Sequence, residues 1–410
     1  MKRLHKKGKY KPDDLSSEPA YRELLTQTHN IINAKVTDSR LSRRMKGAFT
    51  YNTFLFAGLK THAHLFEAAN LLNAKGEIKS FEQWYEKAEK VCNRHKHYLE
   101  AEYDFAVSSV QMAERWEGFK PGDRYYLQYR TASDDRVRIS HRPLHNITLP
   151  KSDPFWDKYF PPNGWRCRCT TVQVLKGDYE QSDSGEAQKA GEKATTYLNK
   201  NGKNKLEIFR FNAGKDGIVF PKNHPYFKVK GADKAKPVIL SVFHHSFARY
   251  KDYKFKVLYK GKKGGVVKIF TTGEQNKREI EKNIRAAKIA ADNGFKYQIL
   301  PVINDENSNP DAYNLGLRIL TDIKVATGKS GRAIIQRSMR KASEQGVSEL
   351  LLHLTVKPDS YRRMYLMGKH ILKKGWYPNI KYVTIIYPDK KVIRYDLKQI
   401  KQRFIKSGKD

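Results

Sequence analysis

The sequence predicts a multidomain fold, in which a mainly helical α+β module precedes a C-terminal α/β (α+β) domain whose central mixed sheet is flanked by helices. Length is the first observation, since 410 residues exceed one ordinary core of about 100 to 200 residues. The second is that residues 24–116 carry apolar side chains at three- and four-residue spacing, whereas residues 251–410 alternate strand-like and helix-like segments. Finally, 39% hydrophobic and 12% aromatic residues provide enough apolar surface to fold.

The N-terminal module is expected to span residues 1–177. Its long helical part gives way at residues 123–174 to short β-like runs around a loop rich in Pro and Trp. Residues 178–250 are expected to be a polar linker and connecting segment: residues 178–204 are polar and poor in large apolar side chains, which indicates an exposed helix or a linker. The C-terminal domain is expected to span residues 251–410.

The elements of the C-terminal domain follow from its periodicity. Strands alternate apolar and polar residues, helices repeat apolar residues every three or four positions, and Gly or Pro separates them. The expected strands are 253–259, 265–270, 295–303, one beginning at 311, one at 317–326, 348–356, 381–387 and 391–396, and the expected helices are 274–294, 331–345 and 361–375.

The net charge of +36 indicates an anionic partner, because many Lys and Arg on a compact surface repel one another unless neutralised. Nucleic acid, RNA or DNA, is the expected partner, bound in a salt-sensitive manner. The alternative is a basic protein without a particular ligand. The sequence contains no run of 18 apolar residues and no apolar segment after its basic start, so we expect neither a membrane span nor a signal peptide. Three cysteines cannot form a disulfide framework, which favours a reducing compartment.

Acidic residues at the start of one predicted strand and inside the next are candidates for a metal site. Asp311 follows Pro310, and Asp322 and Lys324 lie two residues apart, so both project from the same face of a strand. Two carboxylates on neighbouring strands can hold Mg²⁺ or Mn²⁺, which activates water and neutralises charge at a scissile phosphate. Lys324 would stabilise that charge, and Glu281 on the preceding helix is a candidate further ligand. The alternative is a solvent-facing ion pair worth about 0 to 1 kcal/mol.

Pro310-Asp311 and Asp322-Ile323-Lys324, in this strand order, resemble the PD-(D/E)xK nuclease superfamily. The run from about 274 to 396 is similar to the C-terminal toxin domains of contact-dependent growth inhibition proteins. That resemblance implies a nuclease toxin acting on tRNA or other nucleic acid, and a cognate immunity protein. The departure is Asp322, where a glutamate is commoner. Further matching positions are Thr327, Ser330, Ile334 and Gln345.

The helix predicted after the motif has one basic and one apolar half. The apolar half is expected to pack on the sheet and the basic half to follow a phosphate backbone, although a solvated amphipathic face is an equal alternative. Residues 251–410 contain 35 Lys and Arg against 15 Asp and Glu, which favours nucleic acid. The basic residues of this helix are Arg332, Arg337, Arg340 and Lys341.

The stretch 134–169 resembles the characteristic block of phage Mu F-like minor head proteins, also called head morphogenesis proteins, and the resemblance covers roughly residues 40–175. It implies a virion or prophage component, in the particle or the bacterial cytoplasm, that works with portal and capsid proteins. The matching residues are Arg138, His141, Leu144, Pro150, Asp153-Pro154-Phe155-Trp156, Pro161-Pro162-Asn163-Gly164-Trp165 and Cys167-Arg168-Cys169.

The same block contains ligand types for a structural metal. His141, His145, Cys167 and Cys169 could close a tetrahedral Zn²⁺ site and fix a Pro-rich loop, although Cys-x-Cys is shorter than the usual spacing. The alternative is that aromatic residues pack the loop and the histidines satisfy backbone groups.

Together these features predict a phage minor head protein with a C-terminal metal-dependent nuclease of toxin type. One alternative is a metal-independent, barnase-like ribonuclease that uses His353 or His370 as general acid and base. Another is a purely structural capsid protein whose basic C-terminal part binds packaged DNA.

Overall fold

The computed structural model describes residues 1–74, 77–120, 122–245, 250, 253–273, 277–303 and 309–400. The chain divides into two compact units, Met1–Tyr10 with Glu23–Val229, and Lys11–Arg22 with Lys230–Asp410. The multidomain α+β fold class is confirmed. The predicted boundaries at 177 and 250 stay predictions, and residue 251 lies outside the described residues. None of the helices in the described part is both long and apolar enough to span a membrane.

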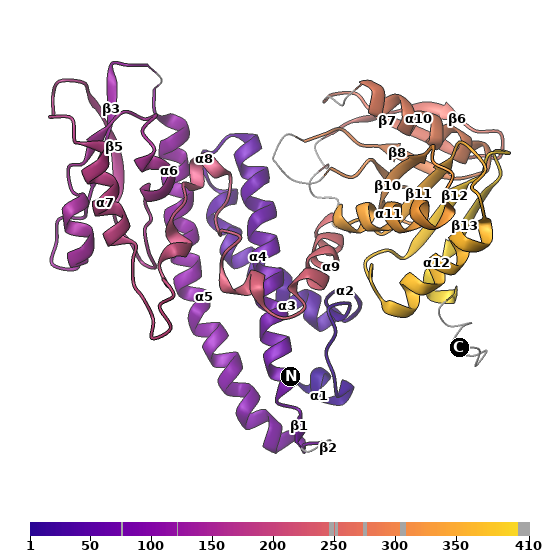
Figure 1. Cartoon of the computed structure of the whole chain (residues 1–410), viewed down its shortest axis with the longest axis horizontal. Helices are drawn as coiled ribbons and strands as arrows, with labels where there is room; N and C mark the ends of the chain where they lie inside the picture. Colours follow the sequence, from indigo (N-terminus) through magenta and orange to yellow (C-terminus); the bar gives the residue numbers. More distant parts are fainter. Residues whose placement is uncertain are drawn as a thin grey trace. The chain divides into compact units, whose positions relative to one another are not determined.

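Two long helices, α4 and α5, form the centre of the first unit (Figure 1). Each begins at a serine whose side chain accepts a hydrogen bond from the first turn, Ser42 for α4 and Ser80 for α5. The indole of Trp84 donates to the carbonyl of Ala68 at 2.9 Å, which joins the two helices. The helical elements here are α1 (Lys2–Lys7), α3 (Pro19–Thr37), α4 (Arg43–Asn70) and α5 (Phe81–Gly118), and a small hairpin of β1 (Asn73–Ala74) and β2 (Glu77–Ile78) joins α4 to α5.

A small antiparallel sheet, ordered β4-β3-β5, follows α5. Its core is aromatic, with Phe155, Trp156 and Phe160 fully buried. Helix α7 packs on the same core through Ala187 and Ala194, so part of the segment predicted to be an exposed helix or linker is a packed helix. The elements are β3 (Tyr125–Arg130), η1 (Ile139–Leu144), β4 (Thr148–Leu149), α6 (Phe155–Tyr159), β5 (Thr170–Leu175) and α7 (Ser184–Ala194).

The segment after α7 completes the first unit. Asn52 of α4 accepts hydrogen bonds from the backbone of Val219 and Phe220 and donates to the carbonyl of Phe220. The Phe220 ring stacks on Phe56 with centroids 3.6 Å apart. Long-range contacts therefore fix a stretch that has little periodicity of its own. Its elements are η2 (Glu207–Phe209), α8 (Ala213–Asp216) and η3 (Pro225–Lys228).

The second unit is built on an eight-stranded mixed sheet ordered β13-β12-β11-β10-β9-β8-β7-β6. Three neighbouring pairs are parallel, β7 with β8, β10 with β11 and β11 with β12, and the others are antiparallel. The strands are β6 (Phe255–Lys260), β7 (Val266–Phe270), β8 (Lys296–Ile299), β9 (Ala312–Asn314), β10 (Ile319–Ala326), β11 (Glu349–Leu354), β12 (Tyr382–Ile386) and β13 (Val392–Asp396).

Helices cover both faces of this sheet (Figure 1). Alternate residues of β11 separate the layers: Leu351 packs with α10, whereas Leu350 and Leu352 pack with α11 and α12. The helices of this unit are α2 (Asp14–Ser17), α9 (Ala232–His245), α10 (Lys277–Asp292), α11 (Gly331–Glu344) and α12 (Tyr361–Lys374), of which α2 packs against α9. The predicted helix starts at residue 274, and residues 274–276 lie outside the described residues.

A buried carboxylate, Glu349 of β11, joins five strands of the sheet. Its side chain is fully buried, and its carboxylate oxygens accept hydrogen bonds from five side chains. The donors are Tyr297, Asn314, Thr321, Thr384 and Arg394. A carboxylate held by this many donors is stable in the interior, because its charge and lone pairs are satisfied.

Candidate functional site

The turn between β9 and β10 places two carboxylates beside each other. The side-chain Oδ1 of Asn314 accepts hydrogen bonds from the backbone amides of Gly316 and Leu317, and Arg318 has a positive φ of 56°. The antiparallel register then pairs Ala312 with Thr321. Because the preceding and following residues are the next pair along, Asp311 lies opposite Asp322.

Lys324 lies between the two carboxylates. Its Nζ is 2.7 Å from Asp322 Oδ1 and 3.8 Å from Asp311 Oδ2. The backbone fixes the Asp311 oxygen that faces Lys324, because the amide of Ile323 donates a hydrogen bond to Asp311 Oδ2 at 2.7 Å. The structure thus brings together Asp311, Asp322 and Lys324, three of the four residues predicted to act in catalysis.

Asp322 is a buried acid with few compensating contacts. Its side chain is only 1% exposed, and within the described part of the chain its buried Oδ2 has no hydrogen-bond partner. Burial first, and then the charge of Asp311, raise the pKa of the Asp322 carboxyl from 3.8 to about 7, against the opposing effect of Lys324. The site therefore contains a buried acid whose charge is incompletely compensated and whose Oδ2 has no hydrogen-bond partner among the described residues.

The fourth predicted residue, Glu281, does not join this group. Its side chain is exposed, whereas Asn283 of the same helix is buried and donates from Nδ2 to Asp311 Oδ1 at 3.0 Å. Side chains two residues apart in a helix point about 200° away from each other around its axis. The packing that buries Asn283 therefore directs Glu281 towards solvent. The sequence feature that could have identified Asn283 as a site residue is its position, as a polar residue, in the apolar stripe formed with Ala286, Ala287 and Ala290.

The donor set fits a hard divalent cation. Asp322 Oδ2 is unpartnered, and each Asp311 oxygen accepts one hydrogen bond from Asn283 or Ile323 and keeps a second lone pair. Mg²⁺ is commonly bound by one or two carboxylates together with water. Lys324 supplies the compensating positive charge to the same oxygens, so an ion and this ammonium would share them.

The helix that follows β10 presents the basic face that the sequence predicts. Ser330 caps α11 through a hydrogen bond from Ala333, and Asp359 accepts from the amide of Gly331 at 2.9 Å. Ile334, Ile335, Met339 and Ala342 are buried. The four basic side chains, Arg332, Arg337, Arg340 and Lys341, are all exposed.

The two histidines of the metal-independent alternative lie in different environments. His353 of β11 is 8% exposed, and burial followed by the charge of Arg285 lowers its pKa. His370 is an exposed residue of α12 whose ring contacts Trp376. His353 follows Leu351 on the α10 face of the sheet, while α12 covers the opposite face, so the two histidines do not share a site.

In the first unit, three of the four residues predicted to bind zinc are together. His141 Nδ1 lies 3.8 Å from Cys167 Sγ and 3.6 Å from Cys169 Sγ, and all three residues are buried. His145 is not part of the cluster, because its Nδ1 faces the backbone amide and hydroxyl of Thr131. The structure therefore brings together three of the four predicted ligands, and zinc binding stays a prediction.

Comparisons with known proteins match parts of this chain. The chain is 48% identical over 44 residues to the putative capsid assembly protein F of Escherichia phage Mu, covering 11% of this chain and 10% of that protein. It is 34% identical over 64 residues to the Mu-like prophage FluMu F protein of Haemophilus influenzae, covering 16% of this chain and 15% of that protein. The matched segments are thus a small part of either relative.

A solved CdiA-CT/CdiI toxin and immunity complex from Burkholderia pseudomallei matches 32% of this chain and 99% of its own length, at 15% identity. The TM-score is 0.25, which does not establish a shared fold. The family described as Phage Mu protein F like protein matches residues 73–172, which include α5, β3, β4 and the His141 cluster and end within β5. The similarity to the Phage Mu protein F like family is therefore a property of the segment 73–172.

Proposed function

We propose that this chain is a phage head component whose second unit is a metal-dependent nuclease of toxin type. The observation that carries the nuclease proposal is the convergence of Asp311, Asp322 and Lys324. Two acids from adjacent strands and one amine lie within contact distance, and the most buried acid retains an unpartnered oxygen. In an ordinary surface ion pair the acids are exposed, and water satisfies their oxygen atoms.

In this proposal Asp311 and Asp322 hold one Mg²⁺ or Mn²⁺ through their carboxylate oxygens. The bound ion would supply Lewis-acid stabilisation and a more acidic water. Asn283 positions Asp311 by its hydrogen bond at 3.0 Å, and the amide of Ile323 restrains the other oxygen. These two donors keep Asp311 oriented when the positive charge at the site changes.

Lys324 acts on the phosphate. Its side chain is 27% exposed and contacts both acids, so its ammonium group can donate to a non-bridging oxygen of the scissile phosphodiester. The oxygen of a water molecule attacks phosphorus and that water gives up one proton to solvent. The phosphorus–oxygen ester bond breaks, and the leaving oxygen takes up one proton from solvent. The ammonium stabilises the negative charge that develops on the phosphoryl oxygens during this step.

The substrate class follows from charge. The exposed basic face of α11 lies directly after β10, the strand that carries Asp322 and Lys324, and can hold the phosphates that flank the cut. We propose RNA, specifically tRNA, as the first substrate to test, with DNA as the alternative. A nuclease active in the cell that makes it requires an inhibitor, so a cognate immunity protein is part of the proposal.

For the first unit, the name of the phage Mu relative suggests a role in capsid assembly, together with portal and other capsid proteins. The protein would then be found in the virion or in the bacterial cytoplasm. The net charge of +36 is also compatible with a purely structural protein that binds packaged DNA. Binding without cleavage would identify that second candidate.

The decisive experiment incubates the full-length protein with total RNA and with plasmid DNA, in Mg²⁺ and in EDTA. We expect cleavage in Mg²⁺ that EDTA abolishes, and loss of cleavage in Asp322→Ala and Lys324→Ala with an unchanged circular dichroism spectrum. Glu281→Ala is the matched control, an exposed acid of the same unit that should retain full activity. Full activity in either site variant, or in EDTA, would contradict the mechanism.

Two outcomes would select the alternatives. Cleavage that survives EDTA but is lost in His353→Ala or His370→Ala would indicate the metal-independent ribonuclease. Salt-dependent retention of DNA with no cleavage under Mg²⁺ or Mn²⁺ would indicate the structural role.

A further inference from the structure

The buried cluster of His141, Cys167 and Cys169 has the geometry of a metal site. The ligand atoms of the three residues all lie within 4.8 Å of one another. Two ligands that share a tetrahedral zinc ion, with sulfur at 2.3 Å and nitrogen at about 2.0 to 2.1 Å, lie about 3.6 Å apart. The observed distances from His141 Nδ1, 3.6 and 3.8 Å, match that value without any movement of the chain.

The short Cys-x-Cys spacing is explained by the backbone at this point. The cysteines directly precede β5, and residues 167, 168 and 169 are buried, exposed and buried in turn. In extended chain, residues two apart project to the same side, so both sulfur atoms face His141 while Arg168 points away. Arg168 instead makes two hydrogen bonds of 2.6 Å with Asp134.

Contacts that do not involve the cluster hold its two segments together. The pair of Asp134 and Arg168 joins the chain before η1 to the chain before β5. Arg138 donates to the carbonyl of Trp165, and the Tyr129 hydroxyl donates to Asn163 at 2.9 Å. Because these contacts fix the backbone on both sides, the three side chains are positioned before any ion binds.

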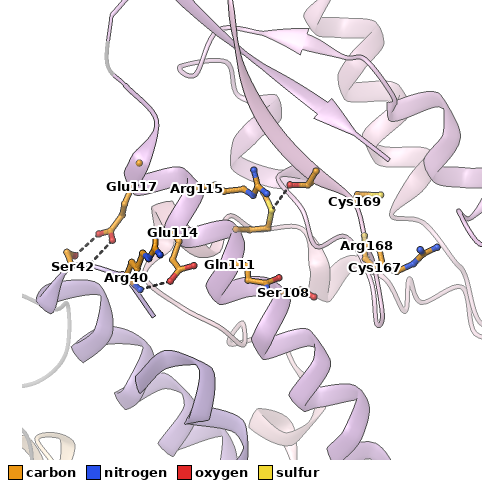
Figure 2. A pocket seen from close by; sticks show the side chains of 13 residues that line it. Arg40, Ser42, Ser108, Gln111, Glu114, Arg115, Glu117, Cys167, Arg168 and Cys169 are labelled. Atoms are coloured by element: carbon orange, nitrogen blue, oxygen red, sulfur yellow. Dashed lines mark hydrogen bonds between the residues drawn. The ribbon is translucent and has the colours of Figure 1, made fainter. Parts of the chain in front are cut away.

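We propose that His141, Cys167 and Cys169 bind one zinc ion, with water from an adjoining cavity as the fourth ligand. Thiolate and imidazole ligands together favour zinc over harder cations, and two thiolates neutralise its double charge in a buried site. One cavity of about 720 Å³ is lined by all three residues. A second, of about 1180 Å³, is lined by the two cysteines and by residues of α5 such as Gln111 (Figure 2).

The ion would cross-link η1 to the start of β5. That link would close the loop between residues 141 and 167, which contains the aromatic core residues Phe155 and Trp156. The zinc site would therefore stabilise the segment that matches the Phage Mu protein F like family, independently of any nuclease activity in the second unit.

The first test is on the unaltered full-length chain, purified under reducing conditions without chelator. We expect about one zinc per chain by atomic emission, and after exchange to Co²⁺ the intense visible absorption of a tetrahedral site with a thiolate charge-transfer band. Of the three cysteines, two should react with a thiol reagent only after the metal is removed. Absence of bound metal and of a cobalt spectrum would overturn the proposal, as would a Cys167–Cys169 disulfide.

Variants then assign the ligands. Cys167→Ser, Cys169→Ser and His141→Ala should each lower the zinc content by about tenfold or more. Cys92→Ser is the matched control, because Cys92 Sγ faces His64 Nε2 at 3.2 Å without a second sulfur, and its zinc content should be unchanged. His145→Ala should also retain zinc. Retention in the ligand variants would overturn the assignment, and if a variant does not fold, the cobalt spectrum of the unaltered chain decides.

Discussion

Replacing Asp322 by asparagine should stabilise the metal-free second unit at pH 8 much more than at pH 5. The pKa of this carboxyl rises from 3.8 to about 7 on folding, chiefly because of burial. Between these two values the folded protein binds a proton that the unfolded chain has released, so folding stability is present at low pH and is lost as pH rises through about 7. The asparagine variant has no such proton to lose.

The magnitude follows from the two pKa values. Between pH 5 and pH 8, the free energy of unfolding of the native protein should fall by on the order of 3 kcal/mol because of this proton linkage. The asparagine variant lacks the titrating group and should not show this decrease. At about 2 to 4 °C per kcal/mol for a domain of 150 to 250 residues, the difference in Tm between Asp322→Asn and the native protein should be roughly 5 to 10 °C larger at pH 8 than at pH 5.

Differential scanning calorimetry in EDTA measures this difference for the full chain. The control is Glu281→Gln, which removes an exposed acid of the same unit and should change Tm equally at both pH values. Addition of Mg²⁺ at pH 8 should raise the Tm of the native protein and not that of Asp322→Asn, because the ion compensates the same charge. An equal stabilisation by Asp322→Asn at both pH values would refute the reasoning.

Three further predictions concern other parts of the molecule. Glu349→Gln should destabilise the second unit by about 3 kcal/mol or more in urea unfolding, because the amide places a donor against donors and leaves Arg394 without its partner; a loss below about 1 kcal/mol would contradict this. Arg337→Ala should weaken binding to RNA and DNA alike and reduce the salt dependence of log Kd by about one phosphate contact, and an unchanged slope would exclude α11 from the interface. The first unit should lose several kcal/mol of stability as pH falls from 7 towards 4, since burial lowers the pKa of four histidines and the unfolded chain gains protons first; a Tm of this unit that does not fall on acidification would contradict the burial. These histidines are His29, His64 and His95, with pKa values of about 4, and His224, at about 3.

Local pattern predicted the elements of the second unit and the residues that face one another within a strand. Asp322 and Lys324 share a face because strand side chains repeat every two residues, and that fact requires no tertiary information. The basic face of α11 follows in the same way from helical periodicity. Each of these predictions depends on covalent geometry acting over a few residues.

Only the tertiary structure decided which candidates meet. The rotation of α10 about its axis selects Asn283 over Glu281, and it is set by which alanines pack on the sheet. His145 leaves the zinc cluster because η1 ends at Leu144 and His145 no longer has helical dihedral angles, so the spacing from His141 does not return the side chain to the same face. Burial, which raises the pKa of Asp322, comes from the layers on both sides of β10 and is absent from any local pattern. The sequence alone thus determined which side chains were available in each element, and long-range packing determined which of them share a site, because packing sets the orientation and burial of each element.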